Sequence, residues 1–272
     1  MIRSQDAAAV LGSANGVPPV NHDIPTLTVL GVPVAALSGE DALKHVGALL
    51  DEPGPALLAY VNTHSLNLAQ RHPSYRRVLH EAALVLNDGS GLAMAAKVQG
   101  KAFPDNLNGT DFTPAVLKLA AERDLGVFLL GGQPGVVQET GQRLLAQIPG
   151  LRIVGSRDGY FPAQAEREVI DQVRASGAAV LLVAFGNPKQ ELWLAEHLSS
   201  TGATLGVAVG AFLDFAAQRV PRAPQWMRQA GVEWLYRLGR EPLRLFHRYV
   251  IGNPLFLFRV WAEQLRRRRK AT

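Results

Sequence analysis

The sequence has no cysteine among its 272 residues. Disulfides, thiolate metal sites and a cysteine nucleophile are therefore excluded, and the absence is compatible with a reducing cytoplasm. The sequence also lacks the Asp-x-Asp pair that commonly holds Mg²⁺ or Mn²⁺ against a nucleotide diphosphate, and its seven histidines show no metal-ligand spacing. We expect no metal site, so an anionic ligand would be bound by side chains such as arginine, whose planar fork matches phosphate.

Long apolar runs are lacking as well. The most apolar stretch near the C-terminus, residues 249–262, is interrupted by Gly252, Asn253, Pro254 and Arg259. A membrane-spanning helix needs roughly twenty apolar residues, so contact with a membrane would have to be made from its surface. Residues 1–21 are rich in Ala, Gly, Ser and Pro and lack the apolar core of a signal peptide. We expect residues 1–25 to form a flexible leader.

Short apolar runs alternate with helical patterns along most of the chain. The runs are Leu27–Ala36, Ala56–Val61, Leu84–Leu86, Val127–Leu130, Leu151–Val154, Val180–Ala184 and Thr204–Val209. The predicted helices are Gly39–Leu50, Ser65–Ala82, Gly91–Val98, Thr110–Arg123, Pro134–Gln147, Ala163–Ala175 and Lys189–Ser199. Several runs are apolar throughout, which is typical of strands buried on both faces. The alternation predicts a Rossmann-like α/β fold over residues 26–225, with an open, mostly parallel sheet and helices on both faces.

Ligands of such sheets bind outside the carboxyl ends of the strands, where loops lead into helices. Five predicted loops at this edge hold glycines, amides and carboxylates: Asn62–Ser65, Asn87–Gly91, Gly131–Gly135, Gly186–Glu191 and Gly210–Asp214. These loops are predicted to form one site.

Two loops have features that suit an anionic ligand. Gly131 and Gly132 follow a strand and open a helix, where bare amides can accept phosphate. The spacing matches neither a P-loop nor the dinucleotide fingerprint, and an ordinary glycine turn would explain it too. Lys189 and Gln190 would point polar groups into the cleft, whereas Glu191 could simply complement a helix start.

Asp88 follows a predicted strand and precedes Gly89 and Gly91. A carboxylate at this place could act as a general base, or it could cap the following helix. Ser90 is disfavoured as a nucleophile because its flanking glycines do not match the nucleophile elbow.

The C-terminal segment, residues 226–272, is predicted to be a basic helical appendage. From residue 233 to 270 it carries ten Lys/Arg against three Asp/Glu, a net charge of +7, whereas the whole chain has +5. Pro242 is expected to restart the helix. Arginines spaced by three or four residues form one helical stripe, and aromatic residues lie between them: Trp234, Tyr236, Phe246, Tyr249, Phe256, Phe258 and Trp261. This pattern suits a phospholipid surface; a solvated helix or a nucleic-acid-binding tail are alternatives.

Eight short motifs stand in order along the chain. They are Asp88-Gly89-x-Gly91, Gly109-x-Asp111, Gly131-Gly132-x-Pro134-Gly135, Gly159-Tyr160-Phe161, Gly186-x-Pro188-Lys189-Gln190-Glu191, Gly210-x-Phe212-x-Asp214-Phe215, Arg222-Ala223-Pro224 and Glu233-Trp234-Leu235-Tyr236-Arg237-Leu238. In this order they resemble the WecG/TagA/CpsF glycosyltransferases, over roughly residues 27–249.

The resemblance implies an inverting, metal-independent transfer of an N-acetylmannosamine-type sugar from a UDP donor to a polyprenyl-diphosphate-linked saccharide, in the synthesis of cell-surface polysaccharides such as teichoic acid. It implies that Asp88 is the base and that the appendage meets the membrane and closes over the donor with arginines. One departure concerns the family's Thr-x-Asn, which here reads Thr63-His64-Ser65. Asn62 or Asn67 could compensate for the missing amide.

We therefore expect a catalytic site of Asp88, Thr63 and Ser65. The expected substrate-binding residues are Gly131, Gly132, Gln190, Asp214, Arg222, Arg237, Arg244 and Arg248. The expected partners are a UDP-sugar, a polyprenyl-diphosphate-linked acceptor and an anionic membrane surface, with no cofactor and no nucleic acid; self-association to a homo-oligomer stays open. The protein is expected in the cytoplasm, peripheral at the inner face of the cell membrane, and truncation before Glu233 is expected to abolish turnover but leave a folded core. The alternative is a non-catalytic, nucleotide-binding scaffold of the same fold at the membrane.

Overall fold

The computed structural model describes residues 24–271, so residues 1–23 of the expected leader lie outside the described part. Its strands are β1 (Thr26–Val29), β2 (Val32–Ala35), β3 (Ala56–Val61), β4 (Leu84–Asn87), β5 (Gly126–Gly131), β6 (Arg152–Arg157), β7 (Val180–Ala184) and β8 (Leu205–Ala208). Strands β3 to β8 form a six-stranded sheet in the order β4-β3-β8-β7-β5-β6, in which every neighbouring pair is parallel. All strands of this sheet therefore end at the same edge.

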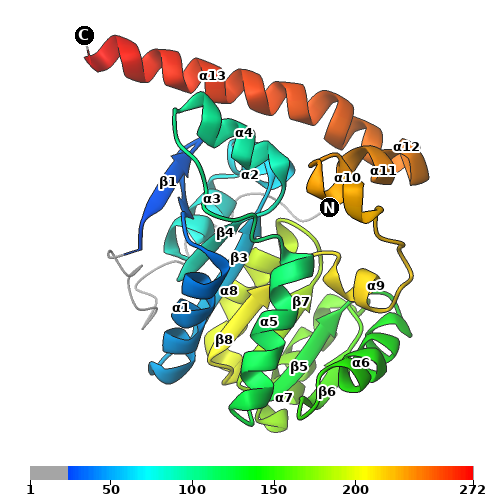
Figure 1. The fold of residues 1–272 in the computed structure, drawn as a ribbon. Helices are drawn as coiled ribbons and strands as arrows, with labels where there is room; N and C mark the ends of the chain where they lie inside the picture. The colour runs from blue at the N-terminus through cyan, green and yellow to red at the C-terminus, as the bar shows by residue number, and fades with distance from the viewer. Residues whose placement is uncertain (1–23, 272) are drawn as a thin grey trace.

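Helices cover both faces of the sheet (Figure 1). The helices of the α/β part are α1 (Gly39–Asp51), α2 (Thr63–Ala69), α3 (Pro73–Glu81), α4 (Ser90–Val98), α5 (Gly109–Glu122), α6 (Val136–Gln147), η1 (Ala163–Ala165), α7 (Glu166–Ser176), α8 (Lys189–Thr201) and α9 (Phe212–Ala216). Alternate residues of one strand enter two different cores, as Leu57 and Leu58 do in β3. The predicted α/β class with a two-sided sheet is confirmed.

Two predicted elements are divided in the structure. The run Leu27–Ala36 is an antiparallel hairpin instead of one strand, because Leu30 and Gly31 take positive φ angles of 49° and 77° between β1 and β2. The predicted helix Ser65–Ala82 is broken before Pro73, which starts α3. Proline lacks the N–H that would continue a helix and clashes with the preceding turn.

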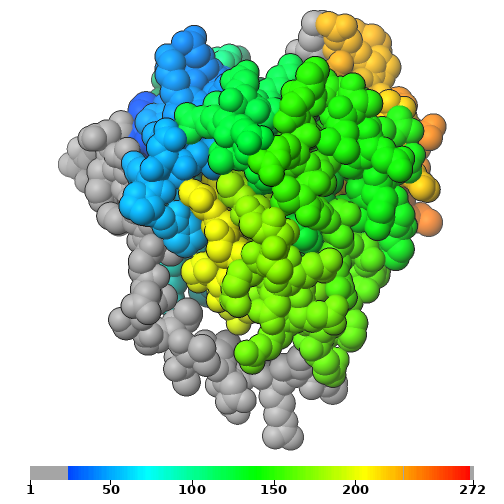
Figure 2. Space-filling model, turned by 90° about the horizontal axis from the view of Figure 1, so that it is seen from below, coloured from blue at the N-terminus to red at the C-terminus, as the bar shows by residue number. Residues whose placement is uncertain are grey.

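The C-terminal segment forms α10 (Gln225–Gln229), α11 (Glu233–Arg240), α12 (Pro242–Phe246), η2 (His247–Ile251) and α13 (Gly252–Ala271). Helix α12 begins at Pro242 as predicted. Helix α13 lies across α2 and α4 above the sheet (Figure 1), and seen from the opposite end the C-terminal helices show only at the rim (Figure 2). Phe256 and Val260 of α13 are buried in the same core as Leu66 and Leu92, so the appendage shares a core with the α/β part. Among residues 24–271, no helix is long and apolar enough to cross a membrane.

Candidate active site

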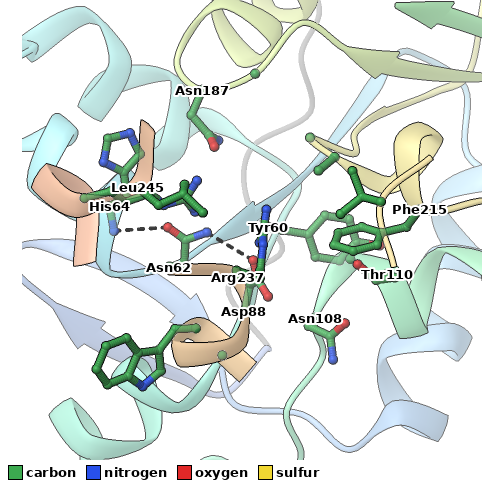
Figure 3. Close-up of a pocket in the computed structure, with 18 of the residues that line it drawn as sticks. Tyr60, Asn62, His64, Asp88, Asn108, Thr110, Asn187, Phe215, Arg237 and Leu245 are labelled. Carbon is green, nitrogen blue, oxygen red and sulfur yellow. Dashed lines mark hydrogen bonds between the residues drawn. The ribbon is translucent and has the colours of Figure 1, made fainter. Parts of the chain in front are cut away.

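A cavity of about 1770 Å³ lies between the carboxyl edge of the sheet and the C-terminal helices (Figure 3). Each of the five predicted loops contributes to its lining, with Asn62, Asp88, Gly132, Gly186 and Gly210 among the residues. Helices α11 to α13 supply much of the remainder, including Glu233, Trp234, Arg237, Arg244, Arg248, Asn253 and Leu257. The predicted convergence of the loops on one site is present.

Asp88 is held in this cavity by the neighbouring strand. Val61 of β3 lies opposite Asn87 of β4, so Asn62 and Asp88 leave the sheet side by side, and the Asp88 N–H donates to the Val61 carbonyl at 2.8 Å. The Asn62 Nδ2 donates to Asp88 Oδ2 at 3.1 Å (Figure 3). The N-cap of α4 is Gly89, with no side-chain capping bond. Asp88 is therefore a cavity carboxylate and not a helix cap.

Thr63 lines the cavity, but its hydroxyl is engaged by the appendage. Its Oγ1 donates to Asn253 Oδ1 of α13 at 2.8 Å, which leaves only lone pairs for a ligand. Gly91 packs directly against Thr63, because a Cβ at position 91 would lie 2.1 Å from the Thr63 Cγ2. This contact explains why the second glycine of the Asp-Gly-x-Gly motif carries no side chain.

The structure does not place Ser65 in the cavity, contrary to the expected catalytic role. Its side chain is fully buried and completes a capping box of α2: Oγ donates to the Asn62 carbonyl at 2.9 Å and accepts from the Asn62 N–H at 2.6 Å. Serine thus binds these local backbone groups, and its side chain also hydrogen-bonds the Tyr75 hydroxyl. Asn67 is also turned elsewhere, toward Gly252 and Arg259 of α13.

Two guanidinium groups of the appendage enter the cavity near Asp88. Arg237 lies over the Phe215 ring, 5.3 Å from its centroid, and Arg248 lies 5.5 Å from the centroid of Tyr249. The Nε atoms of both are buried without a hydrogen-bond partner, and neither forms an ion pair with a carboxylate of the described residues. Burial lowers the pKa of Arg248, and the charge of Arg237 acts in the same direction. Buried charge without a partner is unfavourable, so these groups are suited to an anionic ligand.

Arg244 and Asp214 also line the cavity, as predicted. Arg244 is already paired with Glu241, at 2.6 Å from Nε to Oε2, and therefore offers less uncompensated charge than Arg237 or Arg248. Burial raises the pKa of Asp214, against the opposing effect of Arg244.

Arg222 lies outside the cavity lining. Its Nη1 forms an ion pair with Asp111 Oδ1 at 2.7 Å, which directs the side chain to α5. Arg228 lines the cavity instead, and its Nε is buried without a partner. The Nε of Arg222 is likewise buried without a partner, and Arg228 also lies 4.0 Å from Asp111, so only the lining of the cavity distinguishes the two arginines.

Gly131, the last residue of β5, and Gly132 after it have structural roles. A Cβ on Gly131 would lie 2.5 Å from the Ala184 carbonyl oxygen, and Gly131 does not reach the cavity. Gly132 lines the cavity, but its N–H donates to the Ala184 carbonyl at 3.2 Å. Gly131 allows β5 and β7 to approach closely, Gly132 has a positive φ of 71°, and the Gly132 amide is not free for phosphate.

Gln190 ties two loops together from the cavity wall. Its Oε1 accepts from the backbone N–H groups of Gly186 and Gly210, at 3.1 Å each, and its Nε2 donates to Glu191 at 3.0 Å. The amide is therefore used almost entirely by the protein. Gln190 sets the shape of the wall, and its expected direct contact with substrate is limited to one remaining N–H.

Similarity to known proteins agrees with this geometry. The family model described as "Glycosyl transferase WecG/TagA/CpsF family" matches residues 27–270. The chain belongs to this family. A relative from Bacillus spizizenii (strain ATCC 23059 / NRRL B-14472 / W23), named N-acetylglucosaminyldiphosphoundecaprenol N-acetyl-beta-D-mannosaminyltransferase, is 32% identical over 195 residues, which cover 72% of this chain and 75% of the relative. The resemblance predicted from the motifs is confirmed, and the chain is a glycosyltransferase.

In this WecG/TagA/CpsF glycosyltransferase the cavity also has an aromatic side that the sequence analysis did not assign. Tyr160, Phe161 and Phe185 line it, and the Lys189 Nζ lies 5.1 Å from the Phe185 centroid. Tyr160 is 70% exposed although it directly follows a glycine that hydrogen-bonds Gly132. An aromatic residue at a strand-end loop is the signal that could have identified this side.

His64 lines the cavity beside Arg248. Burial, together with the positive charges of Arg248 and His247, lowers the pKa of His64 to about 4, so its imidazole is neutral at pH 7. Within the described part of the chain, no group of three or more His, Cys, Asp or Glu residues could hold a metal ion.

Proposed function

We propose that this glycosyltransferase moves an N-acetylmannosamine-type sugar from a UDP donor to a polyprenyl-diphosphate-linked saccharide, with inversion and without a metal ion. The name of the Bacillus relative describes transfer of an N-acetyl-β-D-mannosaminyl group to N-acetylglucosaminyl-diphosphoundecaprenol. Its identity of 32% supports the same class of acceptor for this chain. The product would be an intermediate of a cell-surface polysaccharide such as teichoic acid.

One observation carries the proposal: Asp88 shares a cavity with two cationic side chains that have no carboxylate partner. Arg237 and Arg248 come from the appendage, whereas Asp88 comes from the sheet edge. A transfer from a nucleotide diphosphate needs a base for the acceptor and positive charge for the leaving group. Asp88 is suited to the first requirement, and the two arginines are suited to the second.

In the proposed reaction, the Asp88 carboxylate takes the proton of the acceptor hydroxyl. The hydroxyl oxygen attacks the anomeric carbon of the donor from the side opposite UDP, so the new glycosidic bond forms as the bond to the β-phosphate oxygen breaks. UDP leaves with the bonding electron pair, and Arg237 and Arg248 stabilise its added negative charge. Preorganised donors of this kind are commonly worth about 3 kcal/mol each in the transition state.

The aromatic side of the cavity suits the nucleoside of the donor. Tyr160 and Phe185 offer ring faces, and stacking of a base on an aromatic side chain is worth about 1–3 kcal/mol. Asp214 also lines the cavity and offers a carboxylate for ribose or sugar hydroxyls. Thr63, with its free lone pairs, is assigned to the acceptor.

The membrane surface is assigned to the outer face of α12 to α13. Leu243, Phe246, Val250, Phe258 and Trp261 are exposed there; the first three and the last two are spaced by three or four residues, as neighbours on one helix face are. Val250 also lines the cavity, so this apolar stripe reaches the site where a lipid-linked acceptor would react. Arg266 to Arg269, further along α13, are exposed and suited to anionic headgroups. We place the protein at the inner face of the cell membrane on this basis.

The test is release of UDP by the full-length protein, with a short-chain prenyl-diphosphate-GlcNAc acceptor and a panel of UDP-sugars, in the presence of EDTA. We expect release that needs both the acceptor and one UDP-sugar, and a fall of at least a hundredfold for Asp88→Asn, as is typical when a general base is removed. Loss of activity in EDTA would contradict the metal-independent mechanism. Circular dichroism of Asp88→Asn controls for folding.

A non-catalytic scaffold of the same fold makes the opposite prediction, namely that Asp88→Asn binds UDP as the parent does and that neither protein turns over. The membership of a glycosyltransferase family and the base-like placement of Asp88 favour the enzyme.

A further inference from the structure

We propose that Asn62 is the residue that positions the Asp88 carboxylate for proton abstraction. This inference rests on the proposed function, because it assigns a partner to the proposed base. Asn62 belongs to none of the motifs that led to the family. Its place follows from sheet register, since Val61 and Asn87 are paired and the next residue of each strand enters the cavity.

The orientation of the Asn62 amide is fixed by the backbone. Its Oδ1 accepts from the N–H groups of His64 and Ser65, at 3.0 and 3.2 Å. A flipped amide would turn its NH₂ group toward these two donors and its oxygen toward a carboxylate, which are both repulsive arrangements. The Nδ2 is therefore the atom that must face Asp88, where it donates to Oδ2 at 3.1 Å.

The backbone of Asn62 is fixed as well. The Ser65 hydroxyl accepts from the Asn62 N–H and donates to the Asn62 carbonyl, so the capping box holds Asn62 from both sides. A side chain whose acceptor and backbone are both engaged has one rotamer available. Asn62 is thus a rigid donor on the strand next to the base.

Within residues 24–271, the Asn62 amide is the one side-chain hydrogen-bond donor on the Asp88 carboxylate. By binding Oδ2 it fixes the plane of the carboxylate and leaves Oδ1 for the acceptor hydroxyl. A donor on a carboxylate also favours its ionised form, which is the form that a base needs. Position 65 is serine, and the amide that reaches the proposed base comes from position 62.

The decisive variant is Asn62→Ser. Serine is as good an N-cap as asparagine, so α2 keeps its cap, but its hydroxyl is bound by the His64 and Ser65 N–H groups and does not reach Asp88. We expect kcat/KM to fall about tenfold, in line with loss of a hydrogen bond to a charged group. We also expect the acidic limb of its pH profile to change, with the KM for the UDP-sugar changed less than twofold. In Asn62→Asp, a second carboxylate lies beside Asp88 and should change the acidic limb of the pH profile more than Asn62→Ser does.

Asn108→Ser is the matched control. Asn108 is also an N-cap, of α5, and its amide donates to a carboxylate, that of Asp111, at 2.9 Å. Asn108→Ser should lower the free energy of unfolding by an amount comparable to that of Asn62→Ser. It should leave the acidic limb of the pH profile of activity unchanged. If Asn62→Ser keeps the parental pH profile while Asp88→Asn is inactive, the positioning role of Asn62 is wrong. The role of Asp88 as the base is then still supported. If Asp88→Asn is active, the proposed function fails first. An equal shift of the limb in Asn108→Ser would show a general effect of the caps and overturn the inference.

Discussion

Glu191 is a carboxylic acid with no access to solvent. Its Oε1 accepts from the side-chain amides of Asn187 and Gln190, while Oε2 is buried without a partner. Burial raises the pKa of Glu191 to about 7, and the amide donors only partly oppose this effect. Because Gln190 bridges the loops after β7 and β8, the protonation state of Glu191 acts on the wall of the active site.

The pH dependence of stability follows from this pKa. Between the ordinary value near 4.5 and about 7, the folded protein binds more protons than the unfolded chain, so its stability falls as pH rises through this window. Glu191→Gln keeps the shape of the protonated acid and does not titrate. We expect it to match the parent near pH 5 and to exceed it at pH 8 by up to about 3 kcal/mol. Urea midpoints from pH 5 to pH 8 check this, and a difference that is constant with pH would contradict it.

The site could be predicted from the sequence where a local pattern encodes it. Asp88 was identified because it ends a buried strand before glycines, and the arginines of the appendage because of their helical spacing. The hydrogen bond from Asn62 depends on the register of β3 with β4, which no local pattern encodes. Likewise, Arg222 and Arg228 cannot be distinguished without knowing that Arg222 lies closer to Asp111, at 2.7 Å against 4.0 Å, and that only Arg228 lines the cavity.

At the scale of elements, sequence periodicity predicted where strands and helices occur but not how they are divided. A turn of two residues with positive φ separates β1 from β2, and an apolar pattern continues across it. The helical pattern in the sequence continues across Pro73, yet in the structure Pro73 begins a new helix. In both cases the division depends on backbone conformation, whereas apolar periodicity reports only burial.

Helix α13 has a buried face and an exposed face. We expect Phe256→Ala, on the buried face, to lower stability much more than a substitution on the exposed face. Phe256 is fully buried and Phe258 is 62% exposed. Phe256→Ala should cost about 3–5 kcal/mol and lower Tm by roughly 10 °C. Phe258→Ala, the matched control, should stay within about 0.5 kcal/mol of the parent. Thermal unfolding followed by circular dichroism measures both; equal effects would mean that α13 is not docked as described.

This packing changes the expectation for truncation before Glu233. Removal of the appendage would uncover Leu66 and Leu92, which share a core with Phe256. Loss of activity in such a fragment would therefore combine loss of the arginines with loss of the core. Single substitutions of Arg237 or Arg248 separate the two effects, because they leave Phe256 and Val260 in place.

At the scale of the whole molecule, the cavity and the proposed membrane surface lie at one end. The cavity opens at the carboxyl edge of the sheet, and α13 crosses that same end (Figure 1). A soluble donor can enter such a site from water, while a lipid-linked acceptor must come from the membrane side. The positive charge of residues 233–270 is thus concentrated where both anionic substrates are expected.

The orientation of the molecule can be tested with Phe258→Ser combined with Trp261→Ser. The two rings are exposed neighbours, with centroids 6.5 Å apart, so their loss should leave the Tm nearly unchanged. Burial of each ring in a membrane contributes about 1.5–3 kcal/mol, and we expect binding to sedimented anionic vesicles to weaken at least tenfold. UDP release with a short-chain, water-soluble acceptor should persist in the variant.

The salt dependence of vesicle binding distinguishes the electrostatic contribution to membrane binding from the apolar one. Charge attraction is screened within about 8 Å at physiological ionic strength, so parent binding to anionic vesicles should weaken as salt rises and keep an apolar part that the double variant lacks. If the parent instead binds duplex DNA with a steeper salt dependence than vesicles, the appendage is a nucleic-acid surface and the assigned orientation is wrong. If the variant sediments as the parent does, membrane binding resides in charge alone. The apolar stripe would then bind a different partner, and the proposed contact of Val250 with lipid would be wrong.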